Sequence, residues 1–110
     1  MYTFGKSKRL LTKSDYNQVF SDAKRLSTSE FIVLYRKNNQ DDSRLGLAIS
    51  KKILAKSHDR NRIKRIIRES YRQANVASYD IVVLAKTAIK TQSNHHLFTN
   101  LSGLWAKLSK

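Results

Sequence analysis

The chain has 110 residues and carries 22 Lys and Arg against 8 Asp and Glu, which gives a net charge of +14. This length predicts a single domain over residues 1–110 that buries a core large enough to need no stabilising cross-links. The lack of cysteine excludes disulfides and thiolate zinc sites. No apolar run approaches the roughly 20 residues that span a bilayer, and the N-terminus lacks the apolar segment of a signal peptide, so we expect a soluble cytoplasmic protein.

The excess positive charge indicates the kind of partner. A net charge of +14 exceeds what solubility requires, and it destabilises the folded state by self-repulsion until an anion neutralises it. Nucleic acid is the partner class that this charge favours, ahead of an anionic membrane surface or a merely solvated basic surface.

The first quarter of the chain predicts a basic N-terminal arm followed by a helix. The arm covers residues 1–9, and a capping-box pattern predicts that the helix begins at Thr12. Tyr16 and Phe20 fall on one face of this helix, which fades between residues 21 and 24.

The remaining elements follow at short intervals. Residues 31–35 and 45–49 read as strands, and the polar turn between them predicts a hairpin. A basic helix follows, then a strand over residues 79–85, and then a last helix with leucines at helical spacing from Leu97 to Leu108. The predicted order is α-β-β-α-β-α, which is an α+β sandwich of a small sheet and helices.

The basic helix is the most informative segment of the chain. Between Lys51 and Arg72 there are nine Lys or Arg and two acids. One half of the helical wheel is cationic, and the other half predicts a buried face of Ile63, Ile66, Ile67, Ser70, Tyr71 and Ala74. The missing acids at i, i+4 argue against a face laced by salt bridges. Arginine forks and the N-terminus of a helix both suit phosphate, and Ser57 or Asp59 could cap that end.

A specific motif within this segment identifies a family. Ser50-Lys51-Lys52 followed by Arg60-Asn61-Arg62-Ile63-Lys64-Arg65 resembles the RNR motif of the bacterial ribonuclease P protein subunit. The resemblance spans roughly residues 9–108 and includes Leu45-Gly46-Leu47 and the strand from Tyr79 to Lys86. The linker over residues 53–59 is longer than in many members and lacks their glycine.

The resemblance implies an accessory role in a ribonucleoprotein enzyme. The protein would bind the catalytic ribonuclease P RNA subunit and the 5′ leader of precursor tRNA, and assist endonucleolytic removal of the leader. The RNA is the catalyst and holds most of the Mg²⁺, so the resemblance assigns no catalytic or metal-binding residue to the protein, no small-molecule substrate and no membrane partner, and we expect the protein alone to be inactive. The family fold also implies a left-handed βαβ crossover, against the usual right-handed rule.

The resemblance assigns two groups of site residues. The residues expected to contact the catalytic RNA are Ser50, Lys51, Lys52, Arg60, Asn61, Arg62, Lys64, Arg65 and Arg68. The aromatic residues expected to line a leader-binding cleft between the first helix and the sheet are Tyr16, Phe20 and Tyr35. Helical spacing alone favours Tyr16 and Phe20 as core residues, whereas the resemblance places them in the cleft. We therefore interpret them as half-exposed residues at the boundary between the core and the cleft.

Other polar residues suggest rival functions. We interpret His58, His95 and His96 as surface histidines because they have no metal-ligand spacing. Asp80 is either a structural strand-edge residue or a ligand for a hydrated metal ion at the RNA interface. Without the motif, a ribosomal or RNA-chaperone-type protein would fit the charge and size equally well, whereas a stand-alone nuclease lacks a recognisable group of catalytic residues.

Overall fold

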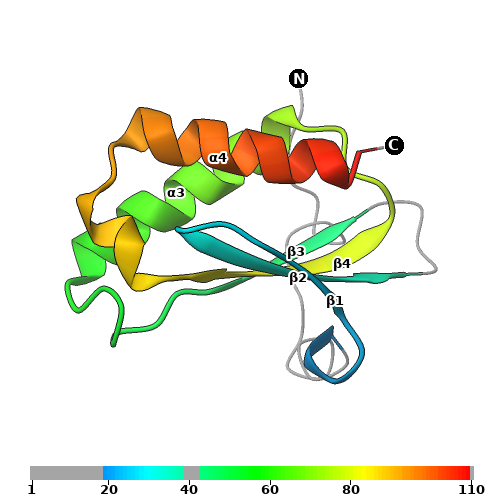
Figure 1. Ribbon diagram of the computed structural model, residues 1–110, viewed down its shortest axis with the longest axis horizontal. Coiled ribbons are helices and arrows are strands. Elements are labelled where there is room, and N and C mark those ends of the chain that lie inside the picture. The colour runs from blue at the N-terminus through cyan, green and yellow to red at the C-terminus, as the bar shows by residue number, and fades with distance from the viewer. Residues whose placement is uncertain (1–18, 39–42, 110) are drawn as a thin grey trace.

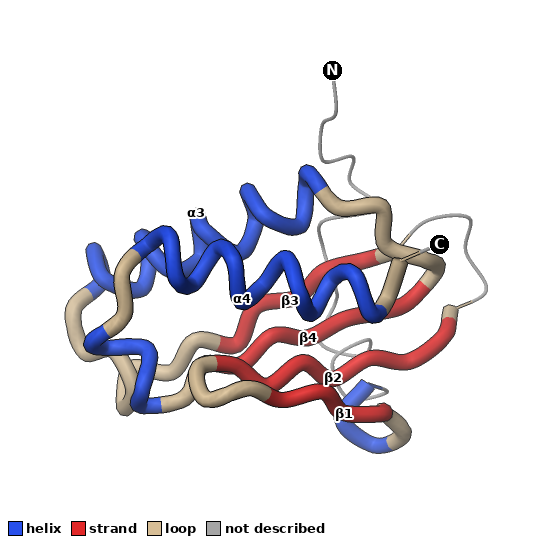
Figure 2. Tube along the Cα trace, turned by 45° about the horizontal axis from the view of Figure 1, so that its top comes forward, coloured by secondary structure: helices blue, strands red, loops and turns tan. Residues whose placement is uncertain are grey.

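The computed structural model describes residues 19–38 and 43–109, which fold as an α+β sandwich, as predicted. The elements are β1 (Lys24–Ser27), β2 (Phe31–Lys37), β3 (Arg44–Ala48), α3 (Ser57–Gln73), β4 (Tyr79–Ala85), the 3₁₀ helix η1 (Thr87–Thr91) and α4 (Asn94–Lys107). Helices α3 and α4 lie side by side over one face of the sheet (Figures 1 and 2). Residues 19–21 are helical, whereas the predicted basic arm and helix start at Thr12 lie outside the described residues.

The sheet differs from the prediction in its pairing. Its strand order is β1-β2-β4-β3, so the predicted hairpin of residues 31–35 with 45–49 is wrong, because β4 lies between these two strands. Strand β2 forms its hairpin with β1 instead, through a turn in which Thr28 Oγ1 accepts hydrogen bonds from the backbone N–H groups of Glu30 and Phe31. The sequence analysis missed β1 because this short, mostly exposed edge strand shows no apolar alternation.

The parallel pair β3 and β4 is connected through α3 by a left-handed crossover. Seen from the helix side of the sheet with both strands pointing upwards, β4 lies to the left of β3 (Figures 1 and 2). This is the hand that the family resemblance implied, and it opposes the strong preference of βαβ units. The crossover brings the start of α3 next to the end of β3, where the basic segment begins.

The main core lies between the sheet and the two helices. The buried residues of α3 are Ile63, Ile66, Ile67, Ser70 and Tyr71, which confirms the apolar half of the predicted helical wheel, although Ala74 is the half-buried C-cap of the helix. Trp105 of α4 packs edge-on against Tyr71, with ring centroids 5.4 Å apart. This packing fixes the rotation of α3 about its axis, so that its cationic half faces away from the core.

A second, smaller cluster occupies the other face of the sheet. Val19 and Val82 are fully buried there, and Leu34 and Leu84 pack against them. Side chains alternate along a strand, so Leu34, Val82 and Leu84 lie on one face of the sheet, and Val33 and Val83 lie on the other face, in the main core. The helical turn at residues 19–21 therefore packs on the sheet face away from α3 and α4 (Figure 1).

Within residues 19–38 and 43–109, the helices are too short and too polar to cross a membrane.

Candidate nucleic-acid interface

The basic surface begins in the turn that follows β3. Lys51 and Lys52 are exposed in this turn. Ser50 closes it, because its carbonyl accepts hydrogen bonds from the N–H groups of Ile53 at 3.1 Å and Leu54 at 3.0 Å. The Ser50 hydroxyl also accepts from Lys52 N–H at 3.0 Å. The serine of the motif therefore shapes the turn that displays the two lysines.

The outer face of α3 continues the basic surface. Asn61, Arg65 and Arg68 are exposed and Lys64 is half-buried. Among the described residues, Lys64, Arg65 and Arg68 form no salt bridge, whereas Arg72 pairs with Glu69 at 3.0 Å. The three cations nearer the N-terminus of the helix are therefore available to an external anion. Arg65 is available even though Glu69 follows it at i+4, where an acid was expected to be missing, and Glu69 pairs with Arg72 instead.

Two arginines of the motif are engaged within the protein. Arg60 donates through Nη1 to the carbonyl oxygens of Leu54 at 2.9 Å and Ala55 at 2.8 Å. Arg62 donates through Nη1 to Oδ1 of Asn94 in the first turn of α4. Helical periodicity could not show these contacts, because each partner lies outside α3.

The start of α3 is not capped as the sequence suggested. The N-cap is Lys56, which makes no side-chain capping hydrogen bond, so the predicted capping by Ser57 or Asp59 is wrong. Ser57 lies inside the helix, and Asp59 is 3.2 Å from Nε2 of its neighbour His58. By contrast, α4 has a capping serine, since Ser93 Oγ accepts from His96 N–H at 3.1 Å. The helix begins one residue too early for Ser57 to be its N-cap and three residues too early for Asp59.

A cationic hollow of about 290 Å³ lies beside this uncapped start. Lys56, Arg62 and Lys90 line it together with Asp59 and residues 53–55. Lys90 comes from η1, an element that the sequence analysis missed because one turn of helix carries too little periodicity. The basic surface thus extends beyond α3.

The aromatic residues predicted for the leader occupy different places. Tyr16 lies outside the described residues. Phe20 is 50% exposed, the only large apolar side chain so exposed among the described residues, and this exposure does not fit a purely core role. Tyr35 is half-buried, belongs to the main core and contacts Tyr79 edge-on with ring centroids 5.2 Å apart. The helical turn that carries Phe20 therefore packs on the sheet face opposite the main core, to which Tyr35 belongs.

A groove of about 370 Å³ runs beside Tyr35. Its lining combines the rings of Tyr35 and Tyr79 with Lys24, Arg36, Lys37, Asp22 and Ala23. The carboxylate of Asp22 lies 3.7 Å from Nε of Arg36. Aromatic rings among lysines are the surface that suits single-stranded nucleic acid. Lys24 and Tyr79 were missed because β1 was not predicted and because Tyr79 was interpreted only as part of a strand.

Asp80 has the environment of a structural carboxylate. It is 6% exposed, and it accepts hydrogen bonds from Arg44 Nε at 2.8 Å, Arg44 Nη2 at 2.7 Å and Asn38 Nδ2 at 2.9 Å. This favours the strand-edge interpretation over a metal ligand, because three of the roughly four lone-pair sites of the carboxylate are already engaged. The part of the chain that the structure describes holds no group of three His, Cys, Asp or Glu suited to a metal ion.

All three histidines, His58, His95 and His96, are exposed, as expected of surface residues. One of them also contacts a buried carboxylate, because Nε2 of His96 lies 3.3 Å from Oε2 of Glu30, which is only 5% exposed. Asn100 Nδ2 donates to the other oxygen of Glu30 at 2.7 Å. Glu30 therefore joins the start of β2 to α4, a role with no signal in the sequence.

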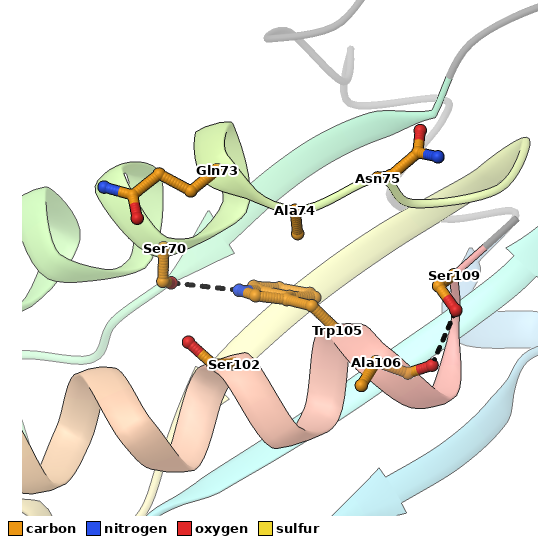
Figure 3. Close-up of a pocket in the computed structure, with 8 residues that line it drawn as sticks. All are labelled: Ser70, Gln73, Ala74, Asn75, Ser102, Trp105, Ala106 and Ser109. Carbon is orange, nitrogen blue, oxygen red and sulfur yellow. Dashed lines mark hydrogen bonds between the residues drawn. The ribbon is translucent and has the colours of Figure 1, made fainter.

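Another hollow, of about 290 Å³, lies near the C-terminal ends of α3 and α4 (Figure 3). Its lining residues are neutral: Ser70, Gln73, Ala74, Asn75, Ser102, Trp105, Ala106 and Ser109. Trp105 Nε1 donates to Ser70 Oγ at 2.9 Å, and Ser70 donates to the Ile67 carbonyl (Figure 3 shows the first of these bonds). This hollow lacks the charge of the surface at the other end of α3, so it is not part of the basic interface.

The fold and the basic surface together define a small α+β protein that binds RNA. The family model described as Ribonuclease P matches residues 4–109. The ribonuclease P protein component of Legionella pneumophila (strain Corby) is 47% identical over 109 residues, which cover 99% of this chain and 96% of that protein. The chain therefore belongs to the ribonuclease P protein family. Its function is that of the protein subunit of ribonuclease P, the endoribonuclease that matures the 5′ ends of tRNA.

Solved structures agree with this assignment. The RNase P protein of Staphylococcus aureus matches with a TM-score of 0.86 at 26% identity, over 96% of this chain and all (100%) of that one. A mutant of the S. aureus protein, described as defective in mRNA degradation activity, matches with a TM-score of 0.82 at 28% identity, over 93% and 87% of the two chains.

Proposed function

We propose that the chain binds the catalytic RNA of ribonuclease P through one continuous basic surface. This surface comprises Ser50, Lys51, Lys52, Arg60, Asn61, Arg62, Lys64, Arg65 and Arg68. The observation that carries the proposal is that Lys64, Arg65 and Arg68 form no salt bridge with a described residue, on a helix whose opposite face is buried. Exposed cations without an ion pair in the protein can neutralise RNA phosphates and so release the counterions bound to the RNA.

The proposal includes a second contact, with the 5′ leader of precursor tRNA. The groove beside Tyr35 and the exposed ring of Phe20 support it, because stacking on aromatic rings tolerates any base. Since the two sites lie on opposite faces of the sheet, the leader would pass around the β1 edge to reach both. Lys24 and Lys37 would hold its phosphates in the groove.

In this proposal, Mg²⁺ is bound mainly by the RNA. The only buried carboxylates among the described residues, Glu30 and Asp80, are each hydrogen-bonded within the protein. The protein would therefore act by holding RNA and substrate together, while RNA-bound metal ions hydrolyse the phosphodiester. We place this activity in the bacterial cytoplasm, where precursor tRNA is made.

The test compares two variants of equal charge. Arg65→Gln with Arg68→Gln should weaken binding to ribonuclease P RNA and reduce the log–log salt slope by about 1.4 to 1.8, at roughly 0.7 to 0.9 per lost phosphate contact. The control, Arg25→Gln with Lys107→Gln, removes the same charge from exposed positions outside the proposed surface. Equal losses in both variants would mean that net charge, and no particular face, drives binding.

A further inference from the structure

The linker between β3 and α3 is held by hydrogen bonds at its start, but it has no side-chain cap at its end. At its start, the Ser50 carbonyl accepts hydrogen bonds from the N–H groups of Ile53 and Leu54. Leu54 is also buried in the main core, at 5% exposure. At its end, the chain enters α3 at Lys56, which provides no side-chain cap. A linker of this length would be free to change shape if nothing held the segment between these two points.

Arg60 supplies the missing restraint. Its Nη1 atom donates to the carbonyls of both Leu54 and Ala55, at 2.9 and 2.8 Å, from the first turn of α3. These carbonyls lie directly before the helix, so the guanidinium ties the incoming chain to the helix that follows. The Arg60 side chain is half-buried, unlike those of Arg65 and Arg68.

We propose that Arg60 is a positioning residue, which fixes the 51–56 segment so that Lys51 and Lys52 meet the RNA in register with α3. This inference rests on the proposed function and divides the arginines of the motif by role. Arg65 and Arg68 would contribute as charges at the RNA, whereas Arg60 would contribute through the shape of its hydrogen bonds. The inference rests on the two hydrogen bonds that one Nη atom of Arg60 donates to successive carbonyls. A guanidinium can donate both bonds from one nitrogen and still has further N–H groups.

Substitution by lysine separates charge from geometry. Arg60→Lys keeps the positive charge, but the side chain ends one atom earlier and has no planar fork, so it cannot reach both carbonyls. If Arg60 acts as a positioning residue, Arg60→Lys should lower RNA affinity about tenfold while leaving the salt slope as in the unsubstituted protein. Arg72→Lys is the matched control, because it makes the same change on the same helix outside the proposed surface.

The decisive experiment is a double-mutant cycle with the lysines that Arg60 is inferred to position. We would measure ribonuclease P RNA affinity for Arg60→Lys, for Lys51→Gln with Lys52→Gln, and for all three changes together. We expect Arg60→Lys to cost less than about twofold once both lysines are replaced, because neighbouring residues that act as a unit are non-additive. Full additivity would overturn the inference, since an independent phosphate contact or a general loss of folding adds to the other losses.

Amide hydrogen exchange on the free protein gives a readout that does not depend on RNA. Arg60→Lys should speed exchange at Ile53 and Leu54, whose N–H groups bond to Ser50, and leave Val82 and Val83 in β4 unchanged. Unchanged exchange at Ile53 and Leu54 would overturn the inference while leaving the proposed function intact. If replacing Lys51 and Lys52 did not weaken RNA binding, this part of the proposed surface would be wrong, and the inference would fall with it.

Discussion

Arg62, in the second turn of α3, and Asn94, the first residue of α4, are joined by a hydrogen bond from the guanidinium Nη1 to the amide Oδ1. The residues are far apart in the sequence, yet this bond holds the RNR motif of α3 against the start of α4. It also restricts the guanidinium to one region of the basic surface, beside the hollow that Lys56 and Lys90 line.

We predict that Asn94→Ala weakens RNA binding with a small loss of fold stability. Removing the acceptor should lower the free energy of unfolding by about 0.5 to 1.5 kcal/mol, as for a typical exposed hydrogen bond, and release the Arg62 guanidinium. Denaturant titration and RNA titration would measure the two effects. His95→Ala, at the exposed neighbouring position, should change neither. If Asn94→Ala binds RNA as tightly as the unsubstituted protein, the orientation of Arg62 is irrelevant to binding.

Phe20→Ala should weaken holoenzyme binding of leader-bearing precursor tRNA more than binding of mature tRNA. Phe20 is half-exposed and would stack on a leader base, which is worth roughly 1 to 3 kcal/mol. Affinities for both RNAs, measured on the same holoenzyme preparation, give the comparison. Equal losses for the two ligands, or unfolding of the variant, would instead assign Phe20 to the core.

Much of the fold follows from the sequence where apolar periodicity is strong. The apolar face of α3 and the strand at 79–85 appear as predicted because burial dictates their patterns. Pairing between strands is a different matter, since residues 31–35 and 45–49 gave no signal that β4 would insert between them. A polar turn between two strands favours a hairpin locally, and only the tertiary packing of β4 overrides that preference.

The site divides in the same way. The cationic row of Lys64, Arg65 and Arg68 could be predicted from spacing and charge alone. The engagement of Arg60 and Arg62 could not, because their partners are a linker carbonyl pair and a side chain from another helix. Glu30 was missed for the same reason, since its partners His96 and Asn100 come from a distant part of the chain.

Ser70→Ala should destabilise the fold without altering the RNA-binding surface. Ser70 is 2% exposed, and its hydroxyl accepts the indole N–H of Trp105, which is 1% exposed. Leaving that buried donor unpaired should cost about 1 to 3 kcal/mol. Thermal unfolding would show the loss, and RNA affinity below the transition should be unchanged. Ser102→Ala, from the same hollow but exposed, serves as the control. Equal stability of the two variants would contradict this reading of the Ser70–Trp105 bond.

Multivalent anions should stabilise the free protein. A net charge of +14 opposes folding through self-repulsion, and the described cations of α3 have few acidic partners. An anion that binds only the folded state adds RT ln(1 + [L]/Kd), or about 2.7 kcal/mol at a hundredfold excess over Kd. Sulfate or pyrophosphate should therefore raise the melting temperature more than chloride of matched ionic strength. Equal effects of chloride would indicate general screening alone.

The most direct test of the whole account is leader removal from precursor tRNA by purified components at low magnesium. We predict that the protein added to ribonuclease P RNA restores cleavage, and that His58→Ala, His95→Ala and His96→Ala support it equally well once folded. The protein without RNA should cleave neither precursor tRNA nor an mRNA, although mRNA degradation activity is named for the S. aureus relative. Robust leader cleavage by the RNA-free protein, or no gain when it joins the RNA, would contradict the account.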